Sequence, residues 1–102
     1  MRLPLLLAVA ALAAGCGSKT TSNASSGSDV FKTAGCGNCH TLAAAGANGR
    51  VGPDLDQVKP DAPLVERQVT NGGGGMPAFK ATLSAAQIKA VADYVSSNAG
   101  KS

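Results

Sequence analysis

The chain has 102 residues, nine basic and six acidic side chains, and a formal net charge of +3. This length excludes two independent domains, and the even spread of single lysines and arginines among acids argues against a nucleic-acid partner. Beyond residue 28 only sixteen side chains are large and apolar. Because so thin a core is marginal in a domain of this size, the composition predicts a disulfide, a metal or a bound group as a stabiliser.

The first fifteen residues are typical of an export signal. Arg2 is followed by twelve uncharged and mostly apolar residues, 3–14. As a helix this run rises only about 18 Å against a hydrocarbon core of about 30 Å, which argues against the alternative of a membrane-spanning helix. Residues 12–16 (Leu-Ala-Ala-Gly-Cys) resemble the bacterial lipobox, although Ala13 replaces the usual leucine. We therefore expect a signal peptide over 1–15 and lipid attachment at Cys16, with ordinary signal cleavage nearby as the alternative.

Residues 16–28 are predicted to form a flexible tether. From residue 17 onward this stretch is rich in serine, threonine and glycine and contains no large apolar side chain. A coil of this length spans roughly 17 to 21 Å, so it would hold a domain beside the membrane while letting the domain reorient. The domain itself is expected over residues 29–102.

Three helices are predicted in this domain. The clearest is the last, because Ser84 and Gln87 form a capping box. The apolar residues that follow recur at helical spacing, with Tyr94 at the edge of their stripe: Ile88, Val91, Ala92 and Val95. A second helix is expected over 62–70 with Asp61 as its cap, and a shorter one over 28–35. No segment alternates between apolar and polar residues, so strands are not expected and the predicted fold class is all-α.

Cys36, Cys39 and His40 form a C-x-x-C-H motif, the attachment sequence of c-type haem. The two thiols add to the vinyl groups of the porphyrin, and the histidine binds the iron from one side. A thioredoxin-like redox pair would require a preceding strand in an α/β fold. A zinc site needs about four ligands, whereas the sequence has three cysteines and one histidine. We therefore expect one covalently bound haem c, which would also supply the missing core.

Met76 is the candidate for the second iron ligand. His40 is the only histidine, and Met1 leaves with the predicted signal peptide, so no other methionine remains. Four glycines, 72–75, precede Met76 and Pro77 follows it, so a regular helix is not expected there. The alternative is that Met76 fills the core, but a Met/His pair is the arrangement found in electron-carrying cytochromes c.

Taken together, residues 27–98 resemble the small monohaem class I cytochromes c of bacteria. The resemblance implies three to four short helices wrapped around one haem, with Cys36 and Cys39 as thioether anchors. It also implies that His40 and Met76 are the two iron ligands, and that Phe31 and Tyr94 lie where the first and last helices cross.

The segment Gly52-Pro53-Asp54-Leu55 resembles the one that lies beside the proximal histidine in this family. The resemblance implies that the Pro53 carbonyl accepts a hydrogen bond from His40 and that Leu55 packs on the haem. Arg50 is a candidate partner for a haem propionate, with a solvated loop charge as the alternative.

The function expected from these features is one-electron transfer without enzymatic activity, between components of a respiratory or photosynthetic chain. The partners would be redox proteins and, through the lipid anchor, the membrane. No small-molecule substrate is expected. The protein would be exported to the periplasm or to the outer side of the bacterial cytoplasmic membrane. One alternative is a subunit of a larger oxidoreductase; another, a small haem sensor or peroxidase, would lack a distal histidine because His40 is already used.

Overall fold

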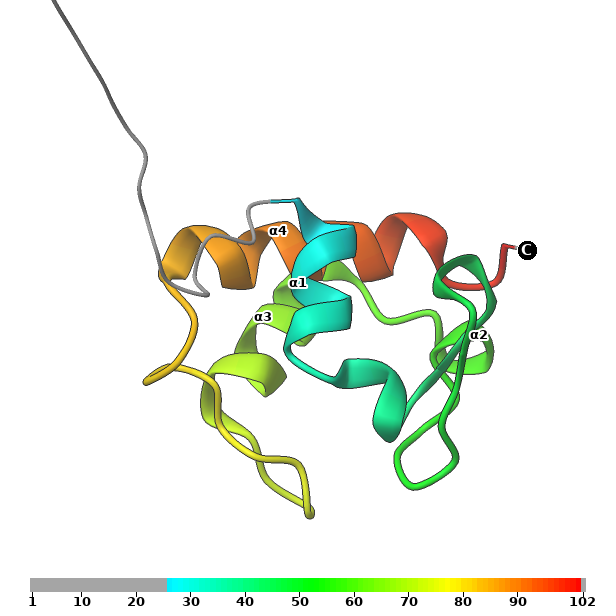
Figure 1. The fold of residues 1–102 in the computed structure, drawn as a ribbon, viewed down its shortest axis with the longest axis horizontal. Coiled ribbons are helices and arrows are strands. Elements are labelled where there is room, and N and C mark those ends of the chain that lie inside the picture. The colour runs from blue at the N-terminus through cyan, green and yellow to red at the C-terminus, as the bar shows by residue number, and fades with distance from the viewer. Residues whose placement is uncertain (1–25, 102) are drawn as a thin grey trace, which may run out of the picture.

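The computed structural model describes residues 26–101, and the predicted all-α class is confirmed for them (Figure 1). Their elements, in chain order, are α1 (Gly27–Thr33), a 3₁₀ turn (Cys36–Asn38), β1 (Thr41–Leu42), a second 3₁₀ turn (Ala43–Ala45), β2 (Ala47–Asn48), α2 (Leu55–Val58), α3 (Ala62–Asn71) and α4 (Ala85–Asn98). The predicted signal peptide, Cys16 and most of the tether lie outside the described residues. Between residues 26 and 101, no helix combines the length and apolarity that crossing a bilayer requires.

The three predicted helices form close to their expected positions. The Ser84 hydroxyl accepts the Gln87 N–H at 3.1 Å and the Gln87 side chain accepts the Ser84 N–H at 2.8 Å, so the capping box begins α4. Asp61 caps α3 by accepting the Leu64 N–H at 3.0 Å. Helix α1 begins at Gly27 with Ser26 as its cap, so it includes the last two residues of the predicted tether.

Helix α4 is the centre of the packing, because both α1 and α3 lie against it (Figure 1). The rings of Phe31 on α1 and Tyr94 on α4 lie 5.9 Å apart between centroids, tilted by 58°. This contact confirms that the first and last helices cross at these residues. The buried apolar core consists of Val30, Phe31, Leu42, Ala47, Val65, Val69, Ile88, Val91, Ala92 and Val95.

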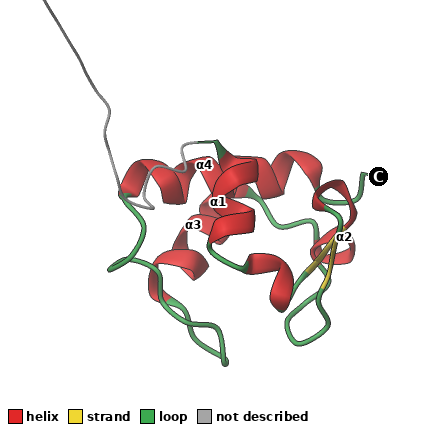
Figure 2. Cartoon of the chain, viewed as in Figure 1, coloured by secondary structure: helices red, strands yellow, loops and turns green. Residues whose placement is uncertain are grey.

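The expectation of no strands is wrong at one place. Thr41–Leu42 pairs with Ala47–Asn48 as a two-stranded antiparallel ladder, drawn in yellow in Figure 2. With only two residues in each strand, no alternation could develop that the sequence would reveal. The hairpin matters for function because Ala47 lies against the 3₁₀ turn of the cysteine motif: a Cβ on Gly37 would stand 2.9 Å from the Cβ of Ala47.

Candidate haem site

The cysteine motif is folded into one compact turn that follows α1. Gly35 precedes it in the left-handed region, at a φ of 78°. The carbonyl of Cys36 then accepts the backbone N–H groups of both Cys39, at 3.2 Å, and His40, at 3.0 Å. These bonds fix the backbone of the three motif residues relative to one another.

Both thiols of the motif are free, and each cysteine is half-buried. Burial raises the pKa of the Cys36 thiol to about 11, and the neighbouring Cys39 adds a smaller effect in the same direction. A thioredoxin-like pair requires the opposite, a thiol whose pKa is lowered so that the thiolate forms near neutral pH. The structure therefore gives the redox-pair alternative no support.

The imidazole of His40 is held by the carbonyl that the resemblance named. Nδ1 lies 2.8 Å from the carbonyl oxygen of Pro53. Because a carbonyl oxygen only accepts, Nδ1 carries the hydrogen and Nε2 keeps its lone pair for a metal. Gly52 lies against the same ring, since a Cβ there would stand 2.8 Å from the Cε1 of His40. A glycine is therefore needed at this position.

Met76 lies on a loop, as predicted, and packs half-buried against the core. Gly73 and Met76 exchange two backbone hydrogen bonds, at 2.9 and 3.1 Å, which close the loop. Gly72, Gly73, Gly74 and Gly75 all have positive φ, at 66°, 118°, 63° and 94°, where other residues are strained. The four glycines thus form a tight turn that presents Met76.

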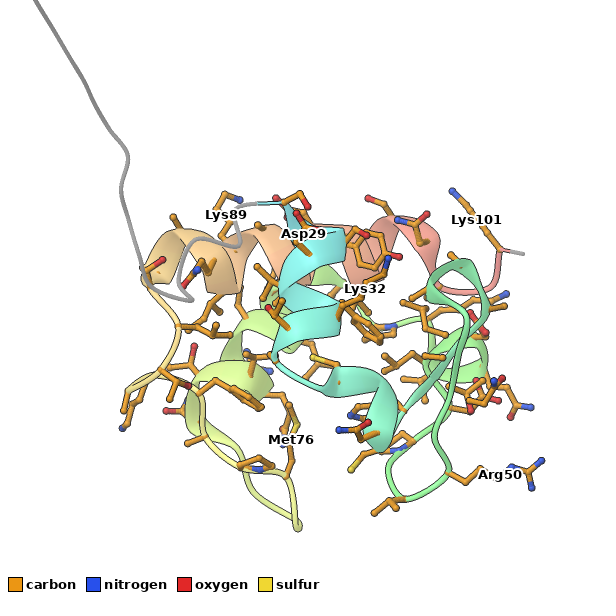
Figure 3. All side chains as sticks on the ribbon, in the orientation of Figure 1. Asp29, Lys32, Arg50, Met76, Lys89 and Lys101 are labelled. Carbon is orange, nitrogen blue, oxygen red and sulfur yellow. The ribbon has the colours of Figure 1, made fainter. Side chains whose placement is uncertain are left out.

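These groups lie on one side of the molecule. In Figure 3 the Met76 loop descends on the same side of the α1–α4 layer as the cysteine motif, across from it. The partly buried apolar residues that border the core include Cys36, Leu55, Met76, Phe79 and Leu83. The site combines two free thiols, an imidazole with a fixed Nδ1–H and a thioether with this apolar border. These donors and their apolar surroundings fit haem c.

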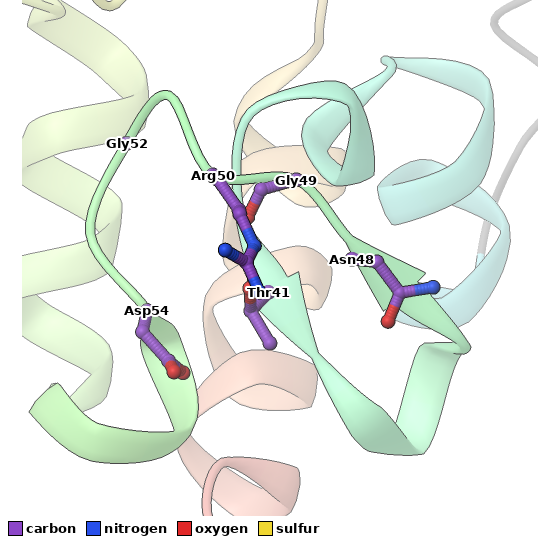
Figure 4. A pocket seen from close by; sticks show the side chains of 6 residues that line it. All are labelled: Thr41, Asn48, Gly49, Arg50, Gly52 and Asp54. Carbon is purple, nitrogen blue, oxygen red and sulfur yellow. The ribbon is translucent and has the colours of Figure 1, made fainter.

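Arg50 is one of the residues that line a polar pocket (Figure 4). The pocket is lined by Thr41, Asn48, Gly49, Arg50, Gly52 and Asp54. In Figure 3 the Arg50 side chain extends outward, away from Met76. This orientation favours the solvated loop charge over a propionate partner. Across residues 26–101, no three histidine, cysteine or acidic side chains gather in a way that could hold a metal ion, so the zinc alternative finds no support.

Two residues near the site were missed by sequence reasoning. Gly49 passes so close to the motif that a Cβ there would lie 2.6 Å from the backbone of Cys39. Asp56 joins distant segments by accepting the N–H groups of Ala43 and Gly100, at 2.9 and 2.8 Å. Its partners are backbone groups 13 and 44 residues away. No sequence pattern marks such a contact.

Known proteins resemble this chain over most of its length. Residues 22–95 match the family described as "Cytochrome C oxidase, cbb3-type, subunit III". Cytochrome c6 of Leptolyngbya boryana is 39% identical over 83 residues, covering 78% of this chain and 96% of the relative. Cytochrome c6 of Microcystis aeruginosa is 40% identical over 79 residues, covering 74% and 96%.

A solved structure agrees with these matches. The c-type cytochrome SorU from Sinorhizobium meliloti superposes with a TM-score of 0.70 at 51% identity, covering 74% of this chain and 88% of SorU. The likeness therefore extends from sequence to fold. The chain belongs to the family of small c-type cytochromes, whose members carry covalently bound haem c.

Proposed function

We propose that this cytochrome is a one-electron carrier, not an enzyme, that exchanges electrons with redox proteins of a respiratory or photosynthetic chain. The observation that carries the proposal is the hydrogen bond of 2.8 Å from His40 Nδ1 to the Pro53 carbonyl. It fixes the ring and leaves Nε2 for the iron. When bound, the haem supplies a reversible ferrous–ferric couple.

The chain's own residues would divide the work of holding the haem. Cys36 and Cys39 would anchor it through two thioether bonds, while His40 and Met76 would bind the iron. Pro53 would keep the imidazole in one tautomer and raise its basicity as a ligand. Leu55, the first residue of α2, would form part of the apolar wall.

Electron transfer is favoured over enzymatic activity because His40 and Met76 would both be bound to the iron. A peroxidase or gas sensor needs an open iron position. The loop that presents Met76 is closed by its own backbone hydrogen bonds, which supports a permanent ligand. The sequence also has no second histidine to act as a distal acid or base. We propose neither a small-molecule substrate nor a nucleic acid as a partner.

The proposal includes export and membrane attachment. A signal peptide over 1–15 would direct the chain out of the cytoplasm, and a lipid on Cys16 would hold it at the outer side of the membrane. The tether over 16–28 would leave the cytochrome domain free to meet partners. The support for this part is the sequence pattern of residues 1–28.

A second candidate is the role of haem subunit in a larger oxidoreductase. The matching family description names an oxidase subunit, which favours this alternative. Native complexes solubilised in mild detergent distinguish the two roles. Migration of the cytochrome as a monomer supports the free carrier, and stable comigration with an oxidase or dehydrogenase supports the subunit.

The ligand set is tested by visible spectra of the purified holoprotein. A carrier with His40 and Met76 as ligands should show a low-spin spectrum, a weak far-red band from sulfur-to-iron charge transfer, and poor carbon monoxide binding when reduced. Met76→Leu should abolish the band and admit carbon monoxide. Leu64→Ala, on the exposed side of α3, is the control and should change neither property. A high-spin spectrum in the unmutated protein would contradict the proposal.

A further inference from the structure

Two short segments beside His40 are joined by hydrogen bonds, and each bond links residues the same number of positions apart in the sequence. One segment is residues 39–43, which includes His40, and the other is residues 52–56, which leads into α2. Every bond links residues 13 positions apart. The segments therefore run side by side in the same direction. The bonds run from Gly52 N–H to Cys39 O (2.6 Å), from His40 Nδ1–H to Pro53 O (2.8 Å) and from Ala43 N–H to Asp56 Oδ2 (2.9 Å).

Asp56 supplies the bond at the far end of this ladder. Its other oxygen, Oδ1, accepts the N–H of Gly100 at 2.8 Å, just beyond the end of α4. One carboxylate thus connects the hairpin segment, α2 and the C-terminal residues. Its pKa lies below the ordinary value, because the N–H of Gly100 and then that of Ala43 stabilise the charged form.

Packing holds residues 51–55, around Pro53, only weakly. Val51 is 84% exposed and Pro53 is exposed as well. Leu55 is only partly buried. With so little apolar burial, the position of Pro53 depends mainly on hydrogen bonds at the two ends of its segment.

We propose that Asp56 is a positioning residue for the proximal ligand: by binding Ala43 and Gly100 it holds Pro53 against His40. This inference rests on the proposed function, in which His40 binds the iron. Without the Asp56 carboxylate, the hydrogen bonds between the two segments would remain only at the Gly52–Pro53 end, and Leu55 would be the main packing contact of the rest. The bond from His40 Nδ1 would then open more often, and the imidazole would become a less basic ligand.

The test compares Asp56→Asn with Asp61→Asn in the holoprotein. Asp61 is a matched control, since its carboxylate also accepts a backbone N–H, that of Leu64 in α3, and no hydrogen bond found within residues 26–101 joins it to either segment. The side chain of Asp56→Asn keeps only one oxygen. Of the N–H groups of Ala43 and Gly100, one therefore loses its acceptor and faces the NH2 group of the amide. Exchange of the His40 Nδ1–H with solvent, followed by NMR in the ferrous protein, should become about tenfold faster than in the control. The reduction potential should rise, because a less basic imidazole stabilises ferric iron less.

The exchange rate decides the outcome. Equal rates in the two variants, with a normal low-spin spectrum, overturn the role of Asp56 and leave the carrier function standing. Absence of the low-spin spectrum in the unmutated protein overturns both the role of Asp56 and the carrier function. If Asp56→Asn does not retain haem, Asp56→Glu replaces it, because the charge remains but is displaced by one methylene. Its exchange rate should lie between that of the unmutated protein and tenfold above it, and a rate equal to that of the control again overturns the proposal.

Discussion

Gly27 lies in direct contact with Tyr94: a Cβ on Gly27 would collide with the Cβ of Tyr94 and with the carbonyl oxygen of Ala90. Helix α1 therefore approaches α4 as closely as two backbones permit. The contact places α1, and through it the cysteine motif that follows, at a fixed position on the core.

The first prediction is that Gly27→Ala destabilises the holoprotein by about 1–3 kcal/mol, because an overpacked contact forces the two helices apart. Thermal unfolding followed by circular dichroism measures the loss. Lys32→Ala, an exposed change on the same helix, is the control and should stay within about 0.5 kcal/mol. Equal melting temperatures for Gly27→Ala and the unmutated protein would show that the helices have room to shift.

The second prediction concerns acid. Asp56 has its pKa lowered from the ordinary value of 3.8 by the N–H groups of Gly100 and Ala43. A carboxyl group whose folded pKa is lowered adds stability above its unfolded pKa and loses it as the pH falls through the folded pKa. The unmutated protein should therefore be more stable than Asp56→Asn at pH 6, and the difference should shrink as the pH drops below about 4. Melting temperatures of both proteins across this range measure the effect; a constant difference would contradict it.

The third prediction concerns the lipid. Cys16→Ser should move the protein from the membrane fraction to the soluble fraction, because the anchor would be lost. Several acyl chains hold a protein firmly, whereas one chain binds only marginally. Ser22→Ala, a change within the tether, should leave the distribution unchanged. If the unmutated protein is already soluble and its mature N-terminus is not Cys16, the anchor is wrong and a diffusible carrier replaces it.

Much of the fold was predictable because its signals are local. The capping box of Ser84 and Gln87 and the cap at Asp61 each act over three residues, and both helix starts were found. The pairing of Thr41–Leu42 with Ala47–Asn48 was missed because strands of two residues carry no periodic pattern.

The residues of the candidate haem site also divide into those with local sequence signals, which were predicted, and those without, which were not. The cysteine motif and the loop of Met76 are contiguous in sequence, so their residue types revealed them. The bond between His40 and Pro53 came only from a family resemblance, because nothing local links positions 13 residues apart. Asp56 was missed entirely, since its partners are backbone N–H groups that any residue but proline supplies.

The last prediction uses two glycines of the Met76 loop. A Cβ on Gly72 would lie 2.6 Å from the carbonyl oxygen of Met76, whereas a Cβ on Gly74 would meet nothing within 4 Å. Both have positive φ, at 66° and 63°, so alanine adds backbone strain at each, and Gly72 also has a ψ of −157°, a combination that only glycine adopts readily. Only Gly72→Ala also pushes Met76 away from its position. It should therefore weaken the far-red band and admit carbon monoxide, while Gly74→Ala only lowers the melting temperature. Identical spectra for the two variants would show that the loop does not hold Met76 through Gly72.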